Sequence, residues 1–100
     1  ESSAEVRKRV NRTRAIQLER FKGEGITSNA EMSEKHLKKY CRLSPECEAI
    51  LKSAFDSLKL SARARSRIIK VARTIADMEL SEEIEPKHIL EAISYRGEEL

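Results

Sequence analysis

Apolar residues recur every three or four positions along most of this chain, which is the spacing of one face of an α-helix. The most regular stripe consists of Cys47, Ile50, Leu51, Ala54, Phe55 and Leu58. No segment alternates apolar and polar residues as a half-buried β-strand does. Only three Gly and two Pro are available for turns among 100 residues. The sequence therefore predicts an all-α fold, a small bundle of about five helices joined by short turns.

Serine and proline mark where most of these helices begin. Ser33, Ser44 and Ser61 each precede a helical stripe and are favoured N-cap residues, while Pro45 and Pro86 suit the first turn of a helix. The sequence thus predicts short turns and capped helices through the second half of the chain.

The last helix is expected to begin at Pro86 and to end before Gly97. Its apolar residues Ile89, Leu90 and Ile93 are predicted to be buried against the bundle.

The first helix is expected over about residues 3–21 and differs from the others in composition. Residues 1–20 carry six Arg or Lys against three Glu, and the apolar positions form only a narrow seam. Such a seam anchors a helix poorly, so the helix is expected to lie loosely on the bundle or to pack on another part of a longer protein. Residue 1 is Glu rather than Met, which also suggests a longer protein. We therefore divide the chain into a basic N-terminal helix, residues 1–22, and a helical domain, residues 23–100.

Charge and hydropathy restrict the class of protein. The formal net charge of +3 is too small to indicate a nucleic-acid partner by itself. No apolar run approaches the roughly 20 residues that span a bilayer, and nothing resembles a signal peptide. We expect a cytoplasmic protein without membrane contact, in which Cys41 and Cys47 are reduced thiols.

The sequence shows no catalytic or metal-binding pattern of its own. It lacks the glycine-rich loop that holds phosphates and the turn that presents a nucleophilic serine. His36, Cys41 and Cys47 lie near one another, but their spacing matches neither a CxxC pair nor the His pair of a zinc finger. We therefore expect no metal site and no cofactor in this chain, with both cysteines in the core.

The helix expected over residues 62–79 carries the most informative pattern. Its apolar arc comprises Ala64, Ile68, Val71, Ala72, Ile75 and Ala76, and a separate polar flank comprises Arg63, Arg67, Lys70 and Thr74. A solvated basic flank explains this pattern without any ligand. A phosphate ligand is the alternative, because two guanidinium groups in the first two turns add to the positive end of the helix dipole.

The same segment carries a family resemblance. The stretch LSARARSRIIKVARTIADME resembles the C-terminal lid of magnesium chelatase-related AAA+ ATPases, the ComM/YifB family. The segments SSAEVRKRVNRTRAIQLERF, NAEMSEKHLKKYCRLSPEC and IEPKHILEAISYR are also similar to that family, so the resemblance covers nearly the whole chain. Arg65 departs from the pattern, since the family often has an aromatic residue there.

The resemblance implies that the helical domain, residues 23–100, is a lid, and that the basic helix, residues 1–22, links it to an upstream AAA+ nucleotide-binding core. It implies that Arg63 is the sensor-2 arginine, which completes an ATP site in the full-length protein, and that Arg67 is a second phosphate-contacting candidate. It further implies ATP and Mg²⁺ as cofactors of the full-length protein, an upstream core in the same chain, and neighbouring subunits in a homo-oligomeric ring, a hexamer. DNA is then the expected substrate of an ATP-driven motor of the branch-migration helicase type, acting in natural transformation and recombination.

Three alternatives remain at the level of sequence. The chain could be the lid of a true magnesium chelatase ATPase subunit. It could be a stand-alone DNA-binding module, with the helix after Ser44 and the helix after Ser61 arranged as a helix-turn-helix. It could also be a helical adaptor, if no ATPase core precedes it.

Overall fold

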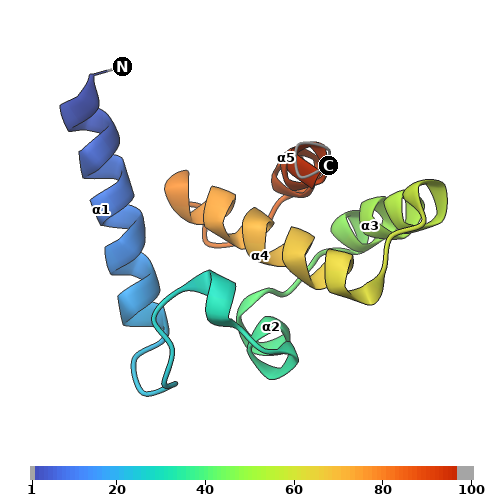
Figure 1. Cartoon of the computed structure of the whole chain (residues 1–100), viewed down its shortest axis with the longest axis horizontal. Coiled ribbons are helices and arrows are strands. Elements are labelled where there is room, and N and C mark those ends of the chain that lie inside the picture. Colours follow the sequence, from blue (N-terminus) through green and yellow to red (C-terminus); the bar gives the residue numbers. More distant parts are fainter. Residues whose placement is uncertain (1, 97–100) are drawn as a thin grey trace.

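The computed structural model describes residues 2–96, which form five α-helices and one turn of 3-10 helix (Figure 1). These elements are α1 (Ser3–Arg20), η1 (Asn29–Glu31), α2 (Glu34–Tyr40), α3 (Pro45–Leu58), α4 (Ala62–Met78) and α5 (Pro86–Arg96). The only β-pairing within residues 2–96 is an isolated parallel bridge between Leu43 and Ile84. The predicted all-α bundle of about five helices is confirmed.

Serine N-caps start three of the helices, and two of them, Ser44 and Ser61, were predicted. Ser2, Ser44 and Ser61 each accept a hydrogen bond on the side-chain oxygen from the backbone N–H three residues later, at 3.2 Å in every case. This bond satisfies one of the N–H groups that have no partner inside the helix. At the other end of α3, Lys59 adopts a left-handed conformation with φ of 53° and reverses the chain toward α4.

The core is built around α4, which packs against α1, η1, α2 and α5. Its predicted apolar arc faces inward: Ile68, Ala72, Ile75 and Ala76 are buried, and Ala64 and Val71 are half-buried. Both cysteines are buried and free, as the sequence predicted. Cys47 is fully buried, and its thiol lies 3.5 Å from the carbonyl oxygen of Ile84.

Helix α5 begins at Pro86 as predicted, but its buried face is rotated from the expected one. Leu90 is 56% exposed, so the prediction that it is buried is wrong. His88, Ile89 and Ala92 face the core instead. His88 can enter the core because both ring nitrogens are satisfied: Nδ1 accepts from Glu85 N–H at 2.9 Å, and Nε2 therefore donates to Glu79 Oε1 at 3.0 Å. Gly97, the predicted stop signal, lies outside the described residues.

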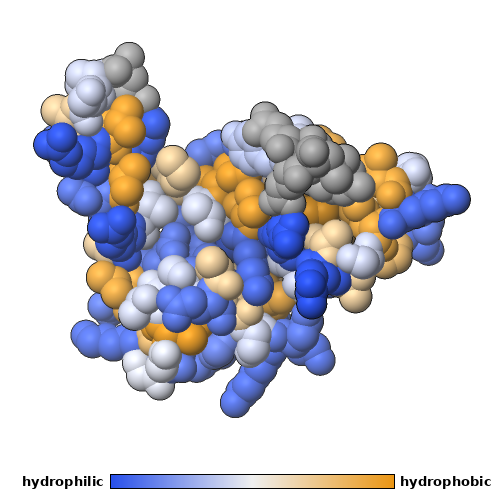
Figure 2. All heavy atoms as spheres, in the orientation of Figure 1, coloured by the Kyte–Doolittle hydropathy of each residue, from blue (hydrophilic) through white to orange (hydrophobic). Residues whose placement is uncertain are grey.

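Helix α1 stands apart from the other helices over its N-terminal half (Figure 1). Val6, Val10 and Leu18 on this helix are exposed, and its two buried residues, Thr13 and Gln17, are polar. Figure 2 shows apolar atoms exposed along this arm. The narrow seam predicted from the sequence is therefore confirmed as a weakly packed one. Within residues 2–96, no helix is both long enough and apolar enough to cross a membrane.

Candidate phosphate-contacting helix and the polar cluster behind it

The first turn of α4 presents Arg63 to solvent. Ser61 caps the helix, and the first turn contains no acidic residue that would neutralise its positive end. Arg63 is exposed, and its guanidinium makes no hydrogen bond or ion pair within residues 2–96. An exposed guanidinium beside a helix N-terminus is well suited to bind an anion.

The neighbouring positions of α4 are held by other helices. Arg65 Nη2 donates to both carboxylate oxygens of Glu48 on α3, at 3.0 Å each. Ser66 Oγ donates to Glu34 Oε1 on α2 at 2.6 Å. These contacts fix the start of α4 against α2 and α3. At position 65, where the family often has an aromatic residue, this chain thus forms an ion pair with α3.

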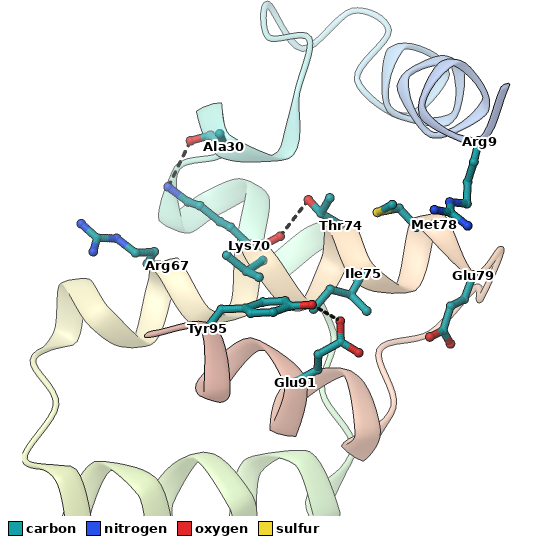
Figure 3. A pocket seen from close by; sticks show the side chains of 11 residues that line it. Arg9, Ala30, Arg67, Lys70, Thr74, Ile75, Met78, Glu79, Glu91 and Tyr95 are labelled. Carbon is teal, nitrogen blue, oxygen red and sulfur yellow. Dashed lines mark hydrogen bonds between the residues drawn. The ribbon is translucent and has the colours of Figure 1, made fainter. Parts of the chain in front are cut away.

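The rest of the predicted basic flank faces a cleft of about 720 Å³. Arg67, Lys70 and Thr74 of α4 line it, together with residues of α1 and α5 (Figure 3). Lys70 Nζ donates to the carbonyl oxygen of Ala30 at 3.4 Å, and Thr74 Oγ1 donates to the Lys70 carbonyl oxygen at 3.1 Å. Arg63 is outside this lining. The four flank residues therefore divide, with Arg63 at the tip of the helix and the other three in the cleft.

The cleft has an apolar floor and charged walls. Val71, Ile75 and Met78 form the floor on α4. Glu91 and Tyr95 line the α5 side, where the Tyr95 hydroxyl donates to Glu91 Oε2 at 2.8 Å (Figure 3). Arg9 reaches the opposite side from α1.

A cluster of polar side chains, all buried except the half-buried Arg20, lies at the other end of α4, around Asp77. Arg20 from the end of α1 donates two hydrogen bonds to the Asp77 carboxylate, at 2.6 and 2.8 Å. Asn29 Nδ2 donates to the same carboxylate at 2.9 Å, and Arg73 Nε donates at 3.2 Å. Gln17 of α1 joins this cluster by accepting from the Asn29 backbone N–H at 3.0 Å. We refer to these five residues as the Asp77 cluster.

Hydrogen bonding and burial shift the pKa values of the two arginines of this cluster in opposite directions. The hydrogen bonds from Arg20 to Asp77 raise the pKa of Arg20. Burial lowers the pKa of Arg73, and the neighbouring Asp77 carboxylate opposes that shift. One carboxylate thus compensates two guanidinium groups, and the remaining donors of Arg73 bond the carbonyl oxygens of Ser81 and Glu82 at 2.7 and 3.1 Å.

Comparison with known proteins shows the family to which the chain belongs. The family model for the C-terminal region of magnesium chelatase subunit ChlI matches residues 1–96. The chain belongs to this family. It is 41% identical over 97 residues to the competence protein ComM of Haemophilus influenzae, and 43% identical over 97 residues to the uncharacterized protein YifB of Salmonella typhimurium. An uncharacterized protein of Mycobacterium tuberculosis is 35% identical over 78 residues.

The matches cover 97% of this chain for ComM and YifB, but only 18% of the length of each relative. For the mycobacterial protein they cover 78% of the chain and 16% of the relative. The chain is therefore the C-terminal domain of a magnesium chelatase-like protein of the ComM/YifB family.

The stretch LSARARSRIIKVARTIADME contains charged residues of two kinds in this structure. Arg63 and Arg67 are exposed at the start of α4, whereas Arg73 and Asp77 are buried at its end. Arg73 is not among the site residues predicted from the sequence, yet its side chain is 4% exposed and is ion-paired with Asp77 at 3.2 Å. The missed signal was the pair of opposite charges four residues apart next to the apolar arc.

A second polar contact holds the loop between α1 and η1 against α2. Glu24 accepts from Lys39 Nζ at 2.7 Å and from the Tyr40 hydroxyl, and these bonds lower the pKa of Glu24 to about 2. Gly23 and Gly25 on either side have φ of 82° and 81°, a left-handed conformation that other residues adopt with strain. The loop is thus shaped to bring Glu24 back onto α2.

The cysteine and histidine side chains form no metal site in the described part of the chain. Burial raises the pKa of Cys41 to about 11, which keeps its thiol protonated and unreactive. The Cys41 thiol lies 3.8 Å from the Met32 sulfur, inside the core.

Proposed function

We propose that this domain is the lid of an AAA+ ATPase and that Arg63 is its sensor-2 arginine, placed to contact the γ-phosphate of ATP. The observation that carries the proposal is the state of the α4 arginines. Arg65 is paired with Glu48 and Arg73 is buried with Asp77, whereas Arg63 projects into solvent from a capped helix N-terminus. A guanidinium left exposed at that position is suited to a phosphate that another domain supplies.

The residues present fit one part of an ATP site only. Arg63 would interact with phosphate oxygens, and its charge would stabilise the transferring phosphoryl group. Within residues 2–96 no group of carboxylates or histidines is placed to hold a metal ion, so Mg²⁺ would be bound by the upstream AAA+ core. Arg67 stands one turn further along α4 and lines the cleft, and we propose it as a secondary phosphate-contacting residue.

For the complete protein we propose an ATP-driven homohexameric motor that acts on DNA, of the branch-migration type. Its support is the similarity to a competence protein and the basic composition of α1. The lid of a metal-inserting chelatase remains the second candidate, because the matching family model bears that name. A helix-turn-helix is disfavoured by the packing: α4, its recognition helix, packs against α1, η1, α2 and α5, and only Ala62, Arg63 and Arg67 along it are exposed.

The experiment compares ATP hydrolysis by the complete protein with that of three variants. Arg63→Ala is expected to lower kcat by about tenfold or more and to weaken nucleotide binding much less, since the contact strengthens as charge develops on the phosphate. Arg63→Lys is expected to rescue poorly, because an ammonium group lacks the planar fork of guanidinium.

Arg65→Ala is the matched control on the same helical turn. It removes a guanidinium that pairs with Glu48 and is expected to hydrolyse ATP at nearly the parent rate. Equal kcat for the parent and Arg63→Ala would remove the sensor assignment. An equal loss of activity in Arg65→Ala would show that any disturbance of this helical turn lowers ATP hydrolysis, and the effect of Arg63→Ala would then not support the sensor assignment.

A further inference from the structure

The Asp77 carboxylate joins three segments of the chain at the end of α4 that lies farthest from Arg63. Arg20 reaches it from α1 with two hydrogen bonds, and Asn29 reaches it from η1. The Asp77 side chain is 1% exposed, so water does not compete for these bonds. Asp77 is therefore the principal polar attachment between α1 and α4.

The N-terminal half of α1 makes little apolar contact with α4. Val6 and Val10 are exposed, and Arg12 makes only a surface hydrogen bond of 3.2 Å to the Met78 carbonyl oxygen. Open clefts of about 720 and about 330 Å³ lie beside α1, and Met78 lines both. Phe21, directly after α1, is 1% exposed and packs edge-on against Tyr40, which anchors the end of α1 to α2. The contact that ties this end of α1 to α4 and sets the angle between the two helices is the Asp77 cluster.

Because the Asp77 cluster lies at the far end of α4, a small change in the angle between α1 and α4 displaces Arg63 by a large distance. In Figure 1 the C-terminal end of α4 faces α1, and its N-terminal end lies on the opposite side of the molecule. Arg63 and Asp77 are fourteen positions apart, which is about 21 Å along a helix at about 1.5 Å per residue. A tilt of about 5° at Asp77 would therefore move the backbone of Arg63 by about 2 Å relative to α1.

We propose that the Arg20–Asp77 pair is the joint that fixes α4 relative to α1, which makes Asp77 a positioning residue for Arg63. The kinetic part of this inference rests on the proposed function, in which α1 leads from the ATPase core to the lid. Misplacement of a phosphate-contacting group by about 1 Å is enough to cost up to about 100-fold in rate. The joint itself is a property of this domain and can be tested without ATP.

The structural test measures backbone residual dipolar couplings of this chain. In the parent, one alignment tensor is expected to fit α1 and α4 together. In Asp77→Asn, which keeps the shape of the side chain and removes its charge, α1 is expected to need its own tensor with reduced order. Arg20→Lys, which keeps the charge and loses the paired hydrogen bonds, is expected to behave in the same way with a smaller effect. Arg65→Ala is the control and should fit one tensor.

If α1 keeps the parent orientation in both Asp77→Asn and Arg20→Lys, the Arg20–Asp77 pair does not fix α4 relative to α1, and the proposal is wrong. The couplings of α2, α3 and α5 show whether Asp77→Asn still folds. If it does not, Arg20→Lys alone decides the test.

The kinetic test is a double-mutant cycle in the complete ATPase. Asp77→Asn is expected to lower kcat by about tenfold with the KM for ATP within about twofold. In an Arg63→Ala background the same change is expected to lower kcat by less than about twofold, because the group that it positions is already gone. Effects that multiply in the double variant would show that Asp77 does not act through Arg63. An Arg63→Ala protein as active as the parent would remove the proposed function and this kinetic role, while the couplings would still decide whether the joint exists.

Discussion

Three arginines on one helix provide a graded test of how burial determines the cost of the same substitution. Arg63, Arg65 and Arg73 all lie in α4, and Arg→Ala changes intrinsic helix propensity only slightly and equally at each position. Arg63 is exposed without a partner in the described residues, Arg65 has a half-exposed ion pair, and Arg73 is 4% exposed. Differences in stability among the three variants therefore report tertiary contacts.

The expected magnitudes follow from those contacts. Arg63→Ala should change the free energy of unfolding by less than about 0.5 kcal/mol, as exposed sites do. Arg65→Ala removes an exposed ion pair that is worth at most about 1 kcal/mol. Arg73→Ala leaves the Ser81 and Glu82 carbonyls without their donor and removes one of the charges that compensate Asp77, a loss of about 3–5 kcal/mol. For a domain of this size that corresponds to a fall in Tm of at least about 12 °C.

The assay is urea unfolding followed by far-ultraviolet circular dichroism, with m-values compared so that only two-state data are used. An Arg73→Ala variant whose free energy of unfolding lies within about 1 kcal/mol of the parent would contradict this prediction. An Arg63→Ala variant that is destabilised as much as Arg73→Ala would also contradict it. Either result would mean that the Asp77 cluster contributes little net stability.

Three further predictions follow from other parts of the structure. Because hydrogen bonds led by that from Lys39 lower the pKa of Glu24 from 4.5 to about 2, its contribution to stability is complete above about pH 4.5 and is lost as the pH falls toward 2. In Glu24→Gln, the free energy of unfolding from urea titrations should fall less between pH 4.5 and 2 than in the parent. The same pH dependence in the variant and the parent would contradict this role of Glu24. Ile89→Ala should cost about 2–5 kcal/mol and Leu90→Ala less than about 0.5 kcal/mol in thermal unfolding, and equal costs would mean that α5 is rotated from the observed position. Amide hydrogens in the first two turns of α1 should exchange faster than those of residues 68–76 in α4, and equal protection would show that α1 packs more firmly than its exposed valines indicate.

The fold was largely predictable because its determinants are local. The 3.6-residue stripes, the serine caps and the first-turn prolines each act within a few residues, and α3 and α4 start where Ser44 and Ser61 place them. The phase of α5 was not predictable in this way. Leu90 and Ile89 are both apolar, and the choice between them depends on a buried histidine that is satisfied by Glu79, nine residues away.

The site was predictable only in part. The exposed position of Arg63 follows from helical phase alone, and the family resemblance singles it out. The burial of Arg73 does not follow, because it requires Arg20 and Asn29 to meet Asp77 from segments 57 and 48 residues away. Charged residues beside an apolar stripe are usually solvated, and only the tertiary structure shows that this pair closes the core.

The most direct measurement of the central claim is a structure of the complete protein bound to a non-hydrolysable ATP analogue and Mg²⁺. In that structure we expect an Arg63 guanidinium nitrogen about 2.7–2.9 Å from a γ-phosphate oxygen, with Arg65 still paired with Glu48 and Arg73 still paired with Asp77. A nucleotide-bound structure in which Arg63 faces solvent, while another residue of this domain contacts the γ-phosphate, would contradict the sensor assignment.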